Sequence, residues 1–350
     1  MLKQTVIRSG LEALYFSGAH VALRGMLGGI GAILTLHHVR PPRRDEFQPN
    51  RLLEIAPAFL EDVIVRLRRS GFDLISLDDM HWRLTKRREG RRFACFTFDD
   101  GYRDNLVHAY PILKRHRVPF AIYVPTSFPD RLGDLWWLTL EAVIAANTRV
   151  RLEMDGKDRY FVCGTPAEKH AAFAALYWWL RGLESEADLR RIIRDLALRY
   201  GVDPAVSCAD LCMSWAELAE LAADPLVTIG AHTVNHLMLK KSSEGVVRQE
   251  MQMSVRVIEA ALGIRPEHFS YPVGDPTSAG PREFAIARSL GFKTAVTTRP
   301  GVLFPEHRDH LTALPRISLN GEFQRLRYVE VLTSGAATAL WNRFKRVDAA

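Results

Sequence analysis

The sequence predicts an α/β protein built around a parallel sheet or a barrel of strands covered by helices. The first observation is a repeated alternation of short apolar segments with longer segments of helical periodicity, which is typical of βαβ units. The second is that three of the apolar segments end in Asp or His side chains. The third is the length of 350 residues, which suits one large domain, and α/β barrels often reach this size.

Eight apolar segments, each too short for a helix, are predicted as strands: 30–36, 72–77, 93–96, 119–125, 227–231, 269–271, 292–298 and 314–317. The helices between them carry recognisable start and stop signals. Pro57 opens a helix that Gly71 ends, and Ser214 begins another with Glu217 three residues later. A long helix over 244–262 follows the fifth strand.

The alternation breaks over residues 130–215, which we interpret as a helical insertion. Trp136 and Trp137 are candidates for stacking on sugar rings, whereas Trp178 and Trp179 are expected to pack inside the insertion. The predicted division of the chain is a helix over 1–29 packed on the barrel, the barrel with its insertion over 30–321, and a helical tail over 322–350.

The composition is that of a soluble globular protein with an excess of positive charge. Hydrophobic residues make up 47% of the chain, charged residues 25%, and the net charge is +7. This excess suits contact with an anionic surface or a glycan, but solvated surface charge is the favoured explanation. Because no basic run is dense, nucleic acid is not expected as a partner. The four cysteines are interpreted as buried free thiols.

The N-terminal segment combines apolar positions with basic ones such as Lys3 and Arg8. Polar and charged residues interrupt its apolar stretch, so we interpret it as neither a secretory signal nor a membrane span. We expect a helix over 2–28 that packs on the barrel, with peripheral membrane contact as the alternative. The expected location is cytoplasmic, with membrane association through this helix left open.

Two adjacent carboxylates stand at the end of the third predicted strand, in the segment Thr97-Phe98-Asp99-Asp100-Gly101-Tyr102. Buried carboxylates are costly unless something neutralises or uses them. A glycine turn can aim both at one place, so that one holds a metal ion and the other acts as a base. The simpler alternative is helix capping by Asp100 or Asp104, because Asp is a common N-cap residue.

A histidine pair, His232 and His236, follows the strand over 227–231. Two imidazoles four residues apart, on a turn or in a first helical turn, can bind one ion. Together with a carboxylate they form a three-ligand site that leaves positions for water and substrate. A histidine pair alone is more often incidental, and it is the combination with the strand-end aspartates that favours a metal site.

These two segments resemble the first two motifs of the polysaccharide deacetylases, carbohydrate esterase family 4, which includes the chitooligosaccharide deacetylases of the nodulation type. Phe269-Ser270-Tyr271-Pro272-Val273-Gly274 is similar to the third motif. The resemblance covers roughly residues 30 to 320 and implies a distorted (β/α)7-type barrel. It also implies a divalent metal ion on Asp100, His232 and His236, with Zn first and Co, Ni or Mn as alternatives, and Asp99 as the general base.

Further roles follow from the resemblance. The segment Leu36-His37-His38-Val39 is similar to the first strand end of a permuted branch of the family, which aligns His37 with the catalytic acid and leaves His38 as the neighbour that could be confused with it. The backbone N–H of Tyr102 is expected in the oxyanion site, and Tyr271 near the substrate. The family's arginine that holds the base is not in its usual place, and Arg316 is the substitute, ahead of Arg265.

The implied activity is a metal-dependent hydrolase that removes N-acetyl groups from oligo- or polysaccharides containing N-acetylglucosamine. The expected partner is therefore an N-acetylated glycan or a glycan-lipid. Two alternatives stay open: an O-acetyl esterase or deformylase acting on a sugar-lipid, and an inactive glycan-binding member of the fold. Intact residues at all three ligand positions argue against the inactive member.

Overall fold

A computed structural model describes residues 2–86 and 90–349. Its centre is a closed barrel of seven parallel strands, in the order β1, β12, β11, β10, β9, β6, β5, and the pairing of β1 with β5 closes the ring. An eighth strand, β4, pairs with the first two residues of β5, Phe93 and Ala94. The strands are β1 (Gly31–Leu36), β4 (Asp73–Leu74), β5 (Phe93–Phe98), β6 (Phe120–Val124), β9 (Val227–Ala231), β10 (His268–Ser270), β11 (Thr294–Pro300) and β12 (Leu314–Ser318). The predicted (β/α)7-type barrel is confirmed.

The register of the strands brings the polar residues that follow them to one level. Leu36 of β1 pairs with Phe98 of β5, so the next residues of the two strands leave the sheet side by side. Val124 of β6 pairs with Ala231 of β9, which pairs in turn with Phe269 of β10. The carboxyl ends of these strands therefore form a shared rim, where barrel proteins carry their functional residues.

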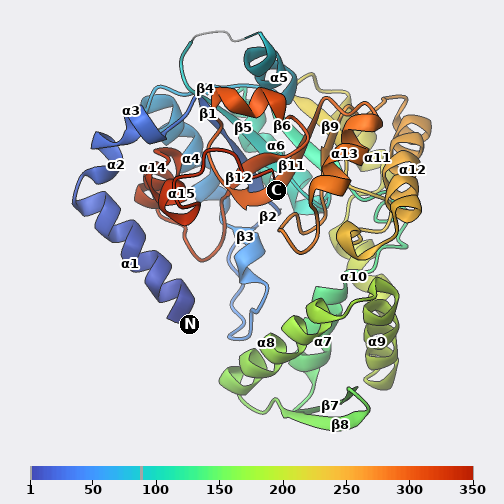
Figure 1. Ribbon diagram of the computed structural model, residues 1–350. Helices are drawn as coiled ribbons and strands as arrows, with labels where there is room; N and C mark the ends of the chain where they lie inside the picture. The colour runs from blue at the N-terminus through green and yellow to red at the C-terminus, as the bar shows by residue number, and fades with distance from the viewer. Residues whose placement is uncertain (1, 87–89, 350) are drawn as a thin grey trace.

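The strand side chains alternate between two apolar clusters, as the period of two requires. On β1 and β5, Ile33 and Cys95 belong to the cluster inside the barrel, whereas Leu34 and Phe96 belong to the larger cluster under the outer helices. Helix α5 (Leu77–Thr85) contributes apolar side chains to the inner cluster. This helix covers the end of the barrel opposite to the insertion (Figure 1).

The outer helices follow the strands closely. They are α4 (Pro57–Arg69), the π-helix η2 (Asn105–Ala109) with α6 (Tyr110–Arg115), α11 (Trp215–Ala222), α12 (Glu244–Leu262) and α13 (Pro281–Ser289). Three 3-10 turns, η1 (Arg51–Leu53), η3 (Leu239–Lys241) and η4 (Pro305–Asp309), and the short pair β2 (His38–Val39) and β3 (Glu54–Ile55) lie in the loops. Helix α11 begins with the expected capping box, in which Ser214 and Glu217 satisfy each other's backbone N–H groups.

The segment between β6 and β9 forms a separate lobe with its own apolar core (Figure 1). Its elements are α7 (Trp136–Ala146), β7 (Arg149–Met154), β8 (Lys157–Val162), α8 (Pro166–Gly182), α9 (Glu186–Arg199) and α10 (Pro204–Leu211). Trp179 packs against this core, but Trp178 is 65% exposed, so the expectation that both pack inside is wrong for Trp178. Neighbours on a helix point in different directions, and only one of the two faces the core.

The two ends of the chain lie on the same side of the barrel (Figure 1). They comprise α1 (Leu2–Phe16), α2 (Ala19–Ala22) and α3 (Arg24–Leu27), and, at the other end, α14 (Leu326–Thr333) and α15 (Ala336–Trp341). The single helix expected over 2–28 is thus three helices, because Gly18 adopts a left-handed φ of 71° and ends the first. The predicted ranges 1–29 and 322–350 each include one residue outside the described part, Met1 and Ala350. None of the described helices is long and apolar enough to cross a membrane.

Candidate active site

The carboxyl rim of the barrel gathers most of the residues singled out in the sequence. Asp99 and Asp100 directly follow β5, and His232 directly follows β9. His37 follows β1, beside the aspartates because β1 and β5 pair in register. Arg316 lies within β12, at the level of Pro300 on β11.

Asp100, His232 and His236 form a compact buried cluster. Their candidate ligand atoms all lie within 4.8 Å of one another. The Nε2 atoms of His232 and His236 are 3.5 Å and 3.2 Å from Oδ1 of Asp100. Burial alone would raise the pKa of the Asp100 carboxyl, but the two imidazoles hold that pKa well below its usual range.

This donor set fits a divalent metal ion. Oδ1 of Asp100 is buried and has no hydrogen-bond partner among the described residues, an expensive arrangement unless a cation satisfies it. Nδ1 of His232 lies 2.6 Å from the Ser270 carbonyl oxygen and donates to it, so in the neutral ring the lone pair that can bind a metal ion is on Nε2. One carboxylate and two imidazoles are ordinary ligands of Zn and of similar ions.

The backbone that carries these ligands is strained. Asp100, Thr233 and His236 have left-handed φ angles of 71°, 66° and 55°, a region that non-glycine residues seldom adopt. Such strain collects at functional sites when the surrounding structure compensates for it. The hydroxyl of Thr233 contributes here, because it accepts the backbone N–H of His236 at 2.9 Å.

Glu250 of α12 fixes the turn between the two histidines. Its carboxylate accepts the backbone N–H groups of Val234 and Asn235, both at 2.9 Å, and the Asn235 side-chain amide at 2.7 Å. The sequence reasoning missed this residue, which lies far along the chain on a helix with several other glutamates. Its only signal was a buried position on the inner face of that helix.

Asp99 is held by Arg316 in a two-pronged ion pair. Nη1 and Nη2 of Arg316 donate to the two carboxylate oxygens at 2.8 Å and 2.6 Å. Burial favours the protonated form of Asp99, but the guanidinium outweighs it and keeps the pKa of this carboxyl below its usual value. The remaining donors of Arg316 bond to Thr297, Thr97 and Ser270. Arg265, the alternative, pairs with Glu259 on the surface.

His37 lies on the other side of Asp99. Its Nε2 is 4.0 Å from Oδ2 of Asp99, and its side chain is 22% exposed. The ring therefore lies beside Asp99 and is partly open to solvent. Burial lowers the pKa of His37, although the negative charges of Asp100 and Asp99 act to raise it. Asn105 of η2 holds the loop by donating to the His37 carbonyl oxygen at 2.7 Å.

His38 belongs to the scaffold of this rim. Its Nδ1 lies 2.7 Å from the carboxylate of Asp104, and its ring stacks on Tyr102 at 3.6 Å between centroids. Asp104 also accepts the Val39 backbone N–H at 3.2 Å. The capping alternative for Asp104 is wrong, since its side chain makes no cap bond to the following helix and ties down the loop of His38 instead.

Tyr102, Tyr271 and the two tryptophans named as candidates for sugar contact, Trp136 and Trp137, are all buried. The Tyr271 ring is fully buried and its hydroxyl donates to the Thr312 carbonyl oxygen at 2.8 Å, so the expectation that it contacts substrate is wrong for its side chain. Tyr102 is also fully buried, and the role expected of it is that of its backbone N–H. Trp136 stacks on Tyr177 inside the insertion. The Trp137 ring lies 5.2 Å from that of His236, so it forms part of the wall beside the cluster.

A closed parallel barrel with a carboxylate–imidazole cluster and a second, arginine-held carboxylate at its carboxyl rim defines a barrel enzyme. The sequence model of the polysaccharide deacetylase family matches residues 153–295. That range includes the histidine pair and the segment 269–274, and it begins after the aspartate pair. Among curated protein sequences, none matches this chain significantly.

Several solved structures share the fold, two of the three described here being named as deacetylases. The Streptococcus pyogenes deacetylase PplD in complex with acetate is 18% identical with a TM-score of 0.55, and the alignment covers 83% of this chain and 92% of that one. IcaB from Ammonifex degensii is 17% identical with a TM-score of 0.54, covering 87% and 97%. A de-N-acetylase from Aggregatibacter actinomycetemcomitans is 14% identical with a TM-score of 0.52, covering 84% and 96%.

The family match over residues 153–295 and the shared barrel make the chain similar to the polysaccharide deacetylases, in agreement with the resemblance that the sequence motifs indicated.

Proposed function

We propose that this protein removes N-acetyl groups from an oligo- or polysaccharide containing N-acetylglucosamine, with a divalent metal ion, Zn first among the candidates, bound by Asp100, His232 and His236. The observation that carries the proposal is the pair of adjacent carboxylates with different surroundings. Asp100 faces two imidazoles, whereas Asp99 is held by Arg316 and lies beside His37. Environments that separate two titratable groups in this way assign them different tasks.

Each residue has a task in amide hydrolysis. Asp99, kept ionised by Arg316, accepts a proton from the attacking water. His37, across Asp99 and open to solvent on one side, delivers a proton to the leaving amine. When bound, the metal ion supplies polarisation of the acetyl carbonyl and acidification of water. In this proposal the acid, His37, follows the first strand, as it does in the permuted branch of the family that the sequence resembles.

The backbone N–H of Tyr102 is the proposed donor to the oxyanion. Among the described residues this N–H donates no backbone hydrogen bond, and it lies two residues after Asp100 in the turn at which Gly101 has a φ of 63°. A fixed donor at the position of developing negative charge stabilises the transition state. The buried ring of Tyr102, stacked on His38, keeps this part of the turn in place.

Acetate release from a length series of N-acetylglucosamine oligomers tests the proposal. The protein is stripped with a chelator and then assayed with no metal and with added Zn, Co, Ni or Mn. We expect release to disappear on stripping and to return with at least one of these ions. N-formyl and O-acetyl sugars, including lipid-linked ones, are assayed in parallel. Preference for either would replace deacetylation by deformylation or ester hydrolysis, and no turnover of any substrate with bound metal would favour a glycan-binding role.

A further inference from the structure

The two ends of the chain build one exposed apolar surface, which we call the terminal surface. Its large side chains lie on α1–α3 and on α15 and the turn after it, and they are between 54% and 74% exposed: Phe16, Val21, Met26, Leu340, Trp341 and Phe344. Among the described residues, twenty large apolar side chains are exposed, and the segments 2–27 and 336–346 contribute eight of them from about a tenth of the chain. Scattered exposed residues need no explanation, but such a concentration marks an interaction site.

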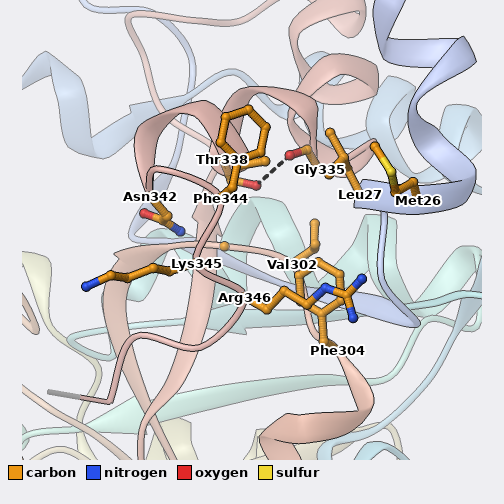
Figure 2. Close-up of a pocket in the computed structure, with 12 residues that line it drawn as sticks. Met26, Leu27, Val302, Phe304, Gly335, Thr338, Asn342, Phe344, Lys345 and Arg346 are labelled. Atoms are coloured by element: carbon orange, nitrogen blue, oxygen red, sulfur yellow. Dashed lines mark hydrogen bonds between the residues drawn. The ribbon is translucent and has the colours of Figure 1, made fainter.

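The two halves of this surface are physically joined. Helix α15 contacts α1, α2 and α3. Its start lies so close to α3 that a Cβ atom on Gly335 would be 1.9 Å from the Leu27 carbonyl oxygen. A cavity of about 210 Å³ lies between them, and its lining includes Met26, Val302, Phe344, Lys345 and Arg346 (Figure 2).

The charge around the terminal surface is positive. Residues 2–29 contain three cations and one carboxylate, and residues 336–349 likewise contain three cations and one carboxylate. Both carboxylates are neutralised within the protein, Glu12 by Arg325 and Arg327 and Asp348 by Arg299. No ion pair within residues 2–86 and 90–349 involves the exposed Arg24, Arg343 or Lys345, whose charges therefore face solvent.

We propose that the terminal surface docks on the face of an anionic phospholipid bilayer. Exposed aliphatic and aromatic side chains among arginines and lysines are what interfacial membrane binding requires, because the apolar groups enter the headgroup boundary while the cations meet lipid phosphates. Self-association through this surface would bring like charges together, which disfavours a second copy as the occupant. The proposal does not depend on the identity of the substrate.

Vesicle co-sedimentation of the full chain tests this directly, with phosphatidylcholine vesicles and with vesicles containing one quarter phosphatidylglycerol. We expect binding to the anionic vesicles, little binding to the neutral ones, and release at high salt. The variant F16S/M26S/F344S should need at least tenfold more anionic lipid for half-maximal binding. The variant R24E/K345E should show a similar shift, because each basic residue contributes about fivefold.

Matched controls are L132S/L198S, which removes two equally exposed leucines from the insertion, and R191E on the same lobe. Both should bind vesicles as the wild type does. All variants should keep the wild-type melting temperature and the wild-type turnover of a soluble substrate, since none of the altered residues lies at the active site. Equal binding to neutral and anionic vesicles, or unchanged binding by both surface variants, would overturn the proposal. A concentration-dependent dimer that only the surface variants lose would assign the surface to self-association instead.

Discussion

At the scale of single residues, the site depends on a buried charge pair. Asp99 and Arg316 are almost completely buried, and all five N–H bonds of the guanidinium have acceptors. A buried carboxylate without such a partner would be protonated or would destabilise the fold. The same arrangement keeps Asp99 ionised, so Arg316 contributes both to stability and to the proposed role of Asp99 as the base.

Replacing Arg316 by Met should therefore lower the free energy of unfolding by about 3–5 kcal/mol, because it leaves the Asp99 carboxylate buried and unpaired. Adding Asp99→Asn should recover much of that stability without restoring turnover. Urea unfolding measures the first effect and acetate release the second. Arg265→Met, which breaks an exposed pair with Glu259, should change stability by no more than about 1 kcal/mol. Strict additivity of the two active-site substitutions in unfolding would contradict the account.

Substitutions of the neighbours His37 and His38 should have different effects on turnover and stability. His37→Gln should lower turnover by about 10²- to 10⁴-fold with metal content and stability close to wild type, because the ring serves proton transfer. His38→Gln should lower stability by about 1–3 kcal/mol, since it removes the partner of Asp104 and the stack on Tyr102, and should affect turnover less. Thermal melting and acetate release on both variants give the answer, and a reversal of the two patterns would exchange their roles.

At the scale of elements, most residues of the candidate site lie at the carboxyl ends of strands, and two of the turns that carry them are braced by helices packed behind them. The turn of His232 and His236 rests on α12 through Glu250, and the loop of His37 rests on η2 through Asn105 and Asp104. These contacts join segments far apart in the sequence. The contacts of Glu250 compensate for the left-handed backbone of His236, which would otherwise relax.

Glu250→Ala should accordingly weaken metal binding by about 10- to 100-fold, because the turn loses three hydrogen bonds and its histidine can leave the ligand position. Metal titration followed by elemental analysis measures this. Glu244→Ala provides the control, since this residue lies on the same helix and pairs only with Arg248 on the surface. Loss of metal affinity in the control to the same extent would show that a general weakening of α12 is responsible.

The elements themselves followed from local sequence signals. Apolar runs bounded by Gly, Pro and Asp predicted the barrel strands, and the aspartate pair and the histidine pair predicted which strand ends meet. The contacts that brace them could not be predicted in the same way. Asp104 is spaced as a helix cap, and only the folded chain shows that it lies 2.7 Å from the ring of His38. Tyr271 and Trp178 were misjudged because burial depends on tertiary neighbours that a single motif does not reveal.

At the scale of the whole molecule, three large apolar clusters and the two chain ends are assembled around one barrel. The side chains on the two faces of the barrel strands form the inner and outer clusters. The third cluster consists mainly of residues of the insertion. A buried histidine, His307, lies in the turn η4 that packs beside α5. Its Nδ1 lies 3.0 Å from the Phe304 backbone nitrogen and 3.2 Å from the Phe304 carbonyl oxygen.

This histidine predicts a pH dependence of stability. Burial lowers the pKa of His307 from 6.5 to about 4. Between pH 6.5 and pH 4 this histidine is therefore protonated in the unfolded chain and neutral in the folded one. The contribution is fully present above pH 6.5 and is lost as the pH falls toward 4. We expect His307→Asn, which keeps an acceptor without titrating, to lose about 2 kcal/mol less stability than the wild type between about pH 7.5 and pH 5. Urea unfolding at the two pH values measures this, and parallel losses in both proteins would refute it.

The most direct test of the central claim is metal content and turnover measured side by side on Asp99→Asn and Asp100→Asn. Removal of a ligand costs metal binding, whereas removal of a base costs proton transfer with the ion still bound. The account predicts that Asp99→Asn keeps its metal and loses about 10²- to 10⁴-fold in rate, and that Asp100→Asn loses both metal and rate. A metal-free Asp99→Asn beside a metal-loaded Asp100→Asn would exchange the two roles. Equal metal loss in both variants would contradict the division of labour on which the mechanism rests.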